Sequence, residues 1–221
     1  MLRAPLPHGS PHVHAVFLPG AASLVVHWLL IETGARHELR RLDLAAGEHK
    51  RPEYLSLNPN GVVPTLLIHG EPITESAALL LHLADAHPSF GLAPEPGSVE
   101  RGRYYQWILH LANTLQPAFR TWFYPHEAAG EANAEAAKEL ARERIEATWD
   151  RIEAHLAKRG PYLLGASASA ADFLLTMLMR WSRNMPRPAT EWPQLAALAQ
   201  RMKARPSFRT LYEREGLTEW A

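Results

Sequence analysis

The chain has 221 residues, 47% of them hydrophobic and 21% charged, which is the composition of a globular protein with one large domain or two small ones. Its 23 basic and 23 acidic residues cancel, so no net field attracts nucleic acid or an anionic membrane, and we expect neither as a partner. Cysteine is absent, which excludes disulfides, thiolate metal sites and a cysteine nucleophile, and the 12 histidines lack metal-ligand spacing.

The N-terminal segment does not have the pattern of a targeting signal. Residues 1–11 hold three prolines and no apolar core, and the chain contains no apolar run of about 18 residues. We therefore expect a loose arm over residues 1–11, no membrane span and a cytoplasmic location, which the absence of cysteine fits.

The first elements in chain order predict a βαβ unit. Residues 13–18 are a short apolar run that ends at Pro19 and predicts a buried strand. Residues 22–33 have the apolar spacing of a helix, and residues 36–43 alternate as a second strand does. A strand, a helix and a strand in this order predict parallel pairing.

A ββα unit follows after the loop that precedes residue 63. Residues 63–68 and 72–74 predict two strands around a His-Gly turn, and residues 75–87 predict a helix rich in Ala and Leu. Residues 88–97 hold three Pro and two Gly, which is the composition of a linker.

The second half of the chain predicts helices alone. Residues 98–116 and 131–159 carry apolar side chains at helical spacing, and Pro117 is expected to kink or break the first of these helices. Residues 170–183 are apolar on nearly all sides and predict a central buried helix. Two further helices are predicted over 192–204 and 207–215.

These elements predict an α/β domain followed by an all-α domain. The predicted boundaries are an N-terminal domain over residues 1–88, a linker over 89–97 and an all-helical domain over 98–221.

Three segments resemble the glutathione transferase superfamily. LNPNGVVPTL at 57–66 and ITESAALLLHLAD at 73–85 carry the likeness, and PGAASLVVH at 19–27 is most similar to the bacterial beta-class and theta-like branches. The resemblance covers nearly the whole chain. It implies a thioredoxin-like N-terminal domain, glutathione as co-substrate without a metal, and attack of its thiolate on a hydrophobic electrophile or a peroxide. It also implies a homodimer, in which the helix after Glu75 packs on the partner's first C-terminal helices.

The resemblance assigns the glutathione contacts to short motifs. Pro64 would be the family's cis-proline, and the N–H and C=O of Val63 would pair with the extended tripeptide as an added strand. Ser76 and Glu75, at the start of a helix, would hold the γ-glutamyl carboxylate and ammonium. His49 and Lys50 would approach the glycyl carboxylate. The alternatives are an ordinary strand start, a plain helix cap and a solvated charge run.

The position that should activate the thiol departs from the family pattern. Ala22 stands where beta-class members have Cys and theta-like members have Ser. Ser23 is the candidate catalytic residue that could replace them, and the backbone N–H groups of Ala22 or Ser23, with the helix dipole, are the second explanation. The third is a glutathione-binding protein with little or no transferase activity; a glutathione-dependent disulfide reductase is another alternative.

Two more groups of residues complete the predicted site. The second substrate is expected against the first C-terminal helices, with His110, Asn113, Arg120 and Tyr124 as its pocket, and Trp107 is expected in the core. Ser169 and Asp172 form a capping box before the most apolar helix, for which we expect a structural role.

Overall fold

A computed structural model describes residues 13–220, so the predicted arm at 1–11 lies outside the described residues. Two compact units are present. The first contains residues 13–90 together with 206–219, and the second contains residues 91–205 with Trp220. Within the described range no helix is both long enough and apolar enough to cross a bilayer.

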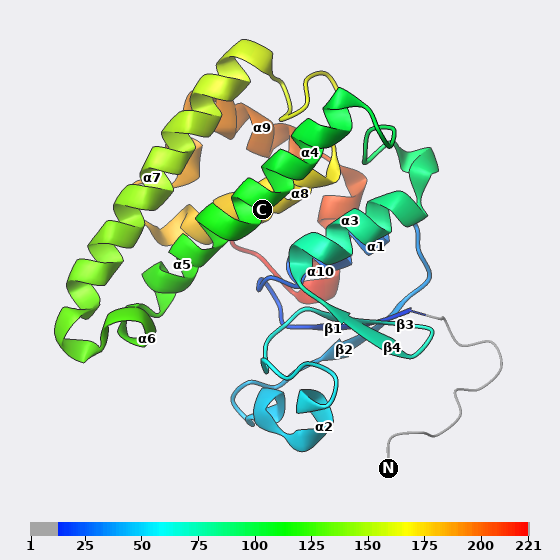
Figure 1. Cartoon of the computed structure of the whole chain (residues 1–221), viewed down its shortest axis with the longest axis vertical. Coiled ribbons are helices and arrows are strands. Elements are labelled where there is room, and N and C mark those ends of the chain that lie inside the picture. Colours follow the sequence, from blue (N-terminus) through cyan, green and yellow to red (C-terminus); the bar gives the residue numbers. More distant parts are fainter. Residues whose placement is uncertain (1–12, 221) are drawn as a thin grey trace. The chain divides into compact units, whose positions relative to one another are not determined.

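The first unit is built on a mixed four-stranded sheet in the order β2-β1-β3-β4 (Figure 1). Its strands are β1 (Val13–Phe17), β2 (Glu38–Arg41), β3 (Thr65–Ile68) and β4 (Glu71–Thr74). β1 is parallel to β2 and antiparallel to β3, and β3 is antiparallel to β4. The sheet thus has the predicted βαβ-ββα connectivity of a thioredoxin-like domain.

Helices pack around this sheet in the first unit. They are α1 (Leu24–Glu32), the short α2 (Pro52–Leu55), α3 (Ser76–Ala86) and α10 (Pro206–Glu215), with 3₁₀ turns η1 (Glu48–Lys50) and η2 (Pro88–Phe90). Helix α1 contacts β1, α3 and α10. Its residues 24–30 are all buried, because a helix that is apolar on every side must be enclosed.

Helix α10 packs in the first unit although it ends the chain. The indole N–H of Trp28 in α1 donates to Ser207 Oγ over 2.9 Å, and the rings of Trp28 and Phe208 lie 5.2 Å apart. The predicted C-terminal domain of residues 98–221 includes this helix. Its apolar spacing predicted the helix, but such spacing does not tell which surface the helix covers.

The second unit is all-helical. Its helices are α4 (Val99–His110), the π-helical turn η3 (Leu111–Leu115), α5 (Gln116–Phe123), α6 (Pro125–Ala129), α7 (Ala134–Arg159), α8 (Ala170–Trp181) and α9 (Pro193–Lys203), with 3₁₀ turns η4 (Glu131–Asn133), η5 (Ser182–Asn184) and η6 (Ala189–Glu191). Every residue of α8 except Trp181 is buried, as its composition predicts. Helix α8 contacts both α4 and α9.

The helical path around Pro117 is interrupted but does not end. The chain passes from α4 through η3 into α5, and Pro117 lies in the first turn of α5. Proline has no N–H to donate to the preceding turn, and the regular α-helical pattern is replaced directly before it by the π-helical turn η3.

Candidate functional site

The loops that carry the predicted glutathione contacts meet at one end of the sheet. β1 and β2 are parallel, so their last residues lie at the same edge. β3 runs the other way and pairs Thr65 with Val16 of β1 and with Thr74 of β4. Consequently the segments after β1, β2 and β4 and the segment before β3 share this edge. They contain, in turn, Ala22–Ser23, His49–Lys50, Glu75–Ser76 and Val63.

Val63 presents an unpaired stretch of backbone. Its peptide bond to Pro64 is cis, as the resemblance implied. Val63 is half-buried, and its backbone makes no hydrogen bond with any described residue. The preceding carbonyl, of Val62, is held by Asn58 Nδ2 at 2.7 Å. The backbone is therefore held in place just before Val63, and an extended peptide can form backbone hydrogen bonds with Val63.

The turn from β4 into α3 creates a second binding element. Glu75 adopts a φ of 69°, an unusual backbone region for a residue with a side chain, and this sharp turn starts α3 at Ser76. No side chain caps the start of α3, and the start of a helix is where backbone N–H groups can meet an anion. Ser76 is buried at this start, and the exposed carboxylate of Glu75 has no partner among the described residues.

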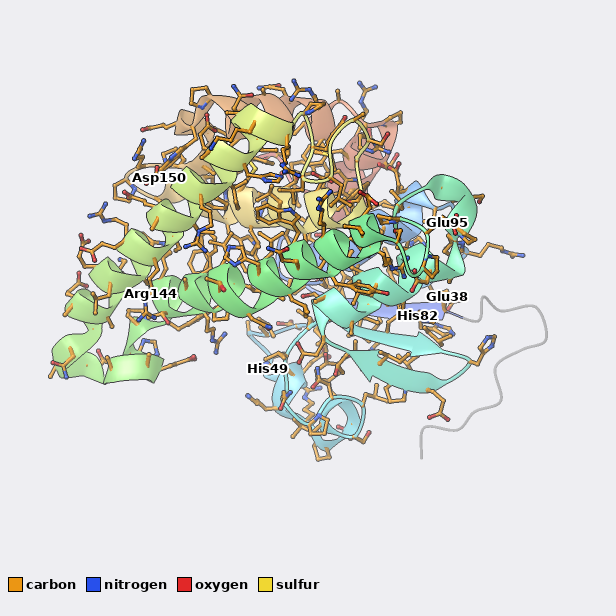
Figure 2. The ribbon with its side chains drawn as sticks, turned by 45° about the horizontal axis from the view of Figure 1, so that its top comes forward. Glu38, His49, His82, Glu95, Arg144 and Asp150 are labelled. Carbon is orange, nitrogen blue, oxygen red and sulfur yellow. The ribbon has the colours of Figure 1, made fainter. Side chains whose placement is uncertain are left out.

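The basic pair after β2 lies beside the segment that leads to Val63. A methyl group added to Gly61 would lie 2.8 Å from the carbonyl oxygen of His49 and 3.1 Å from Nζ of Lys50. Tertiary packing thus places the ammonium of Lys50 next to the 58–63 turn. Figure 2 shows His49 in the same part of the unit as α2, and its Nδ1 is buried without a hydrogen-bond partner.

At the start of α1, the Ser23 hydroxyl is already occupied. Its oxygen accepts from the N–H of Leu18 over 3.0 Å and donates its one proton to the carbonyl of Leu18 over 3.1 Å. By contrast, the backbone N–H groups of Ala22 and Ser23 have no acceptor among the described residues. Ala22 is partly exposed whereas Ser23 is buried. The donors free to meet a ligand here are amides.

Sequence reasoning missed a buried pair that supports this loop. Glu215 of α10 accepts from the N–H of Gly20 over 2.9 Å, and its other oxygen lies 2.8 Å from Nδ1 of His27. The side chains of His27 and Glu215 are both fully buried. The two residues are 188 positions apart, and a lone His in an apolar helix is the only signal that the sequence offers.

The predicted second-substrate residues lie on α4, η3 and α5 and at the junction with α6. Burial, and secondly the charge of Arg151, lowers the pKa of His110, so the ring is neutral at pH 7. Asn113 is exposed in η3. Arg120 binds both carboxylate oxygens of Glu127, at 2.8 and 2.7 Å, and stacks on Tyr124. The charge of Arg120 is therefore already paired with that of Glu127, and this ion pair links α5 to α6.

The capping box at the start of α8 is present in the second unit. The N–H and the hydroxyl of Ser169 both donate to Oδ2 of Asp172, at 2.8 and 3.0 Å. The other oxygen, Oδ1, accepts from the N–H of Leu163 over 2.9 Å. Asp172 thereby joins the loop after α7 to the start of α8.

Comparisons with known proteins cover both units. Residues 15–85 match the family model described as "Glutathione S-transferase, N-terminal domain", and residues 113–213 match "Glutathione S-transferase, C-terminal domain". Glutathione S-transferase GST-4.5 of Xanthomonas campestris is 32% identical over 203 residues, which cover 90% of this chain and 97% of the relative.

Two solved structures illustrate the structural similarity. A glutathione transferase of Methylococcus capsulatus has a TM-score of 0.84 at 31% identity, over 93% of this chain and 100% of its own. A sphingomonad glutathione S-transferase in complex with glutathione has a TM-score of 0.81 at 34% identity, again over 93% and 100%.

Proposed function

The chain belongs to the glutathione S-transferase family, and from this membership we infer that it is a glutathione transferase. In the reaction, the thiol of glutathione loses its proton and the sulfur forms a bond to an electrophilic atom of a hydrophobic substrate, whose leaving group departs with its electron pair. With a peroxide, the sulfur attacks oxygen and the O–O bond breaks. The observation that carries this function is the unpaired backbone of Val63 next to the uncapped start of α3.

We propose that glutathione lies across the four loops in the order of the strands. Its γ-glutamyl carboxylate would bind the first amides of α3 and Ser76, and its ammonium would bind Glu75. Its cysteinyl backbone would pair with Val63, and its glycyl carboxylate would face Lys50 and His49. Four strands span about 14 Å, and three extended residues span about 11 Å. An extended tripeptide therefore spans most of this edge, and the long side chain of Lys50 can cover the remaining distance.

The amides at the start of α1 are the proposed activators of the thiol. The sulfur would lie at the end of β1, where the N–H groups of Ala22 and Ser23 have no other acceptor among the described residues. Hydrogen bonds from these amides and the positive end of the α1 dipole favour the thiolate over the thiol and so lower its pKa. In this arrangement the missing Cys or Ser side chain at Ala22 reduces the activation without abolishing it.

We further propose a cytoplasmic homodimer with a second substrate held by His110, Asn113 and Tyr124. Helix α4 supports the dimer, since Tyr105 and Leu109, which lie one turn apart on the same face, are 40% and 49% exposed. An exposed apolar face of this kind is typical of an interface. The proposed partner of this face is α3 of a second copy.

Replacement of Ser76 by Ala tests the placement of glutathione. We expect the affinity for reduced glutathione to fall about 10- to 100-fold, because one charge-assisted hydrogen bond is worth roughly 1.5–3 kcal/mol. Isothermal titration calorimetry measures this change, and Ser167→Ala, an exposed serine of the second unit, is the matched control.

The function itself has two readouts. Turnover of a general aryl halide with glutathione should be saturable in the wild-type protein. Absence of both turnover and binding heat at millimolar glutathione would contradict the proposed function, whereas normal binding by Ser76→Ala would contradict only the placement.

A further inference from the structure

Three buried polar side chains surround the carbonyl group of Val62, the residue before Val63. They are Tyr54 of α2, Asn58 of the segment that follows α2, and Thr65 at the start of β3. Their exposed fractions are 1%, 1% and 0%, so water does not replace a hydrogen bond that any of them loses. The side chain of Val63 packs against the same apolar core as the ring of Tyr54.

Two of these side chains donate to the carbonyl oxygen of Val62. The hydroxyl of Tyr54 lies 2.5 Å from this oxygen, and Nδ2 of Asn58 lies 2.7 Å from it. Oδ1 of Asn58 accepts from the N–H of Asn60 over 3.1 Å, which fixes the orientation of the side-chain amide. A carbonyl oxygen has two lone pairs, so the two donors occupy both of them and hold the carbonyl from two directions.

The hydroxyl of Thr65 completes the hydrogen-bond network. Its Oγ1 lies 2.9 Å from the hydroxyl of Tyr54. A carbonyl oxygen can only accept, so Tyr54 uses its one proton on Val62 and accepts the proton of Thr65. Burial raises the pKa of the Tyr54 phenol, so this hydroxyl keeps its proton at neutral pH. The network therefore has one direction, from Thr65 through Tyr54 to Val62.

The carbonyl of Val62 and the N–H of Val63 belong to one peptide group. This group is trans, because the cis bonds among the described residues precede Pro64 and Pro161. A trans peptide group is planar, and its C=O and N–H point in opposite directions. The donors that hold the carbonyl of Val62 therefore turn the N–H of Val63 away from Tyr54. This N–H has no acceptor among the described residues.

We propose that Tyr54, together with Asn58, is a positioning residue for glutathione. Tyr54 acts through the peptide group of Val62 and Val63, and it sets the direction of the amide that donates to the cysteinyl carbonyl of the tripeptide. An amide that already points outward loses little freedom when it binds, and this pre-organisation strengthens binding. The inference rests on the proposed placement of glutathione along this edge of the sheet.

A comparison of Tyr54 with Thr65 separates positioning from a purely structural role. Tyr54→Phe keeps the ring and removes one of the two donors to Val62. Thr65→Val keeps both donors and removes a buried hydroxyl from the same network. Each variant loses buried hydrogen bonds, so we expect both to unfold at a lower urea concentration than the wild type. Only Tyr54→Phe should weaken glutathione binding.

Titration calorimetry of the full chain with S-methylglutathione measures this difference. We expect Tyr54→Phe to bind about fivefold more weakly, since one hydrogen bond is worth roughly 1 kcal/mol. Thr65→Val should keep the affinity of the wild type. Asn58→Ala removes the other donor and should weaken binding as Tyr54→Phe does. The matched control is Ser56→Ala, since this exposed hydroxyl donates to the carbonyl of Glu53 over 2.9 Å and does not reach Val62.

The outcomes of this titration distinguish the inference from the proposed function. Unchanged affinity in Tyr54→Phe, or an equal loss in Thr65→Val, would overturn the positioning role while the wild type still binds. Absence of binding by the wild type would overturn the proposed function and this inference together.

Nuclear magnetic resonance observes the amide itself. The chain has seven valines, so selective ¹⁵N-valine labelling gives few signals, and that of Val63 is assigned by its loss in Val63→Ile. We expect S-methylglutathione to move the Val63 amide proton downfield, as a new hydrogen bond does, and to move it less in Tyr54→Phe. An amide that the ligand does not move in the wild type would contradict the pairing. Equal shifts in the two proteins would show that Tyr54 does not direct this amide.

Discussion

At the scale of single residues, the start of α1 shows that a side chain of the right chemical type can be unavailable to a ligand. The sequence places Ser23 one position after Ala22, which makes its hydroxyl a candidate donor to the thiolate. The structure uses both hydrogen-bonding functions of this hydroxyl on Leu18. The distinction matters because a hydroxyl has one proton, and a proton donated to Leu18 is not donated to a ligand.

Replacement of Ser23 by Ala distinguishes the two explanations of thiol activation. If the backbone amides act alone, the pKa of bound glutathione stays within a few tenths of the wild-type value, as measured by thiolate absorbance against pH. The protein should nevertheless lose about 1–2 kcal/mol of unfolding free energy, since the polar groups of Leu18 lose a buried partner. A thiol pKa that returns toward its value in free glutathione would instead assign the hydroxyl as donor.

Gly61 is the second residue whose role depends on its neighbours. Its φ is 63°, and the carbonyl oxygen of His49 lies 2.8 Å from the point that a Cβ would occupy, so both the backbone and the packing oppose a side chain. We expect Gly61→Ala to lower the unfolding free energy by about 2 kcal/mol and to weaken glutathione binding through Lys50.

Chemical denaturation and calorimetry measure the two effects of Gly61→Ala. Gly70→Ala is the matched control, because Gly70 also has a positive φ but no atom within 4 Å of the added methyl group. Equal losses in both variants would mean that the close approach to His49 has no energetic effect.

At the scale of elements, the start of α8 shows which structural features a local sequence motif predicts and which it does not. The spacing of Ser169 and Asp172 is enough to predict the capping box. It does not indicate that Asp172 is completely buried or that Leu163 supplies a third donor. Burial raises the pKa of Asp172 to about 6, because desolvation of the carboxylate outweighs the hydrogen bonds from Leu163 and Ser169 that favour ionisation.

This raised pKa predicts a pH dependence of stability. Between the ordinary value of 3.8 and about 6, the folded protein holds the Asp172 proton while the unfolded chain has released it. The contribution of Asp172 is therefore complete below pH 3.8, and it falls as pH rises to about 6. A shift of about two units corresponds to roughly 3 kcal/mol.

Asp172→Asn removes this titration and serves as the reference. We expect the difference in unfolding free energy, wild type minus Asp172→Asn, to decrease from pH 4 to pH 6 and to level off above that. Urea unfolding at a series of pH values measures it. A difference that is constant over this range would show that the hydrogen bonds, and not burial, govern the carboxyl.

At the scale of the whole molecule, the chain returns at its end to the unit in which it began. Residues 206–219 belong with residues 13–90, and Glu215 bonds to Gly20 and His27 in the two segments that form the thiol end of the proposed site. Helix α10 thus stabilises the loop after β1, so a substitution that weakens the packing of α10 should also disturb the proposed glutathione site.

Glu215→Ala tests this support. Loss of the carboxylate leaves the buried Nδ1 of His27 without its partner and removes the hydrogen bond from the N–H of Gly20, so we expect a loss of about 3 kcal/mol of unfolding free energy. Turnover should fall more than glutathione affinity, because the loop that positions Ala22 loosens. Glu213→Ala, an exposed glutamate two positions earlier on α10, is the control. Equal stability of the two variants would contradict the inference.

The sequence by itself determined the features that depend on residues close together in the chain. Alternation and helical spacing separated the sheet-bearing half from the helical half, LNPNGVVPTL and ITESAALLLHLAD indicated the family, and Ser169–Asp172 indicated a cap. The tertiary structure alone decided the occupation of the Ser23 hydroxyl, the approach of Lys50 to Gly61 and the packing of α10 against α1. The physical reason is that periodicity and capping act within a few residues, whereas these contacts join segments whose separation in sequence bears no relation to their distance in space.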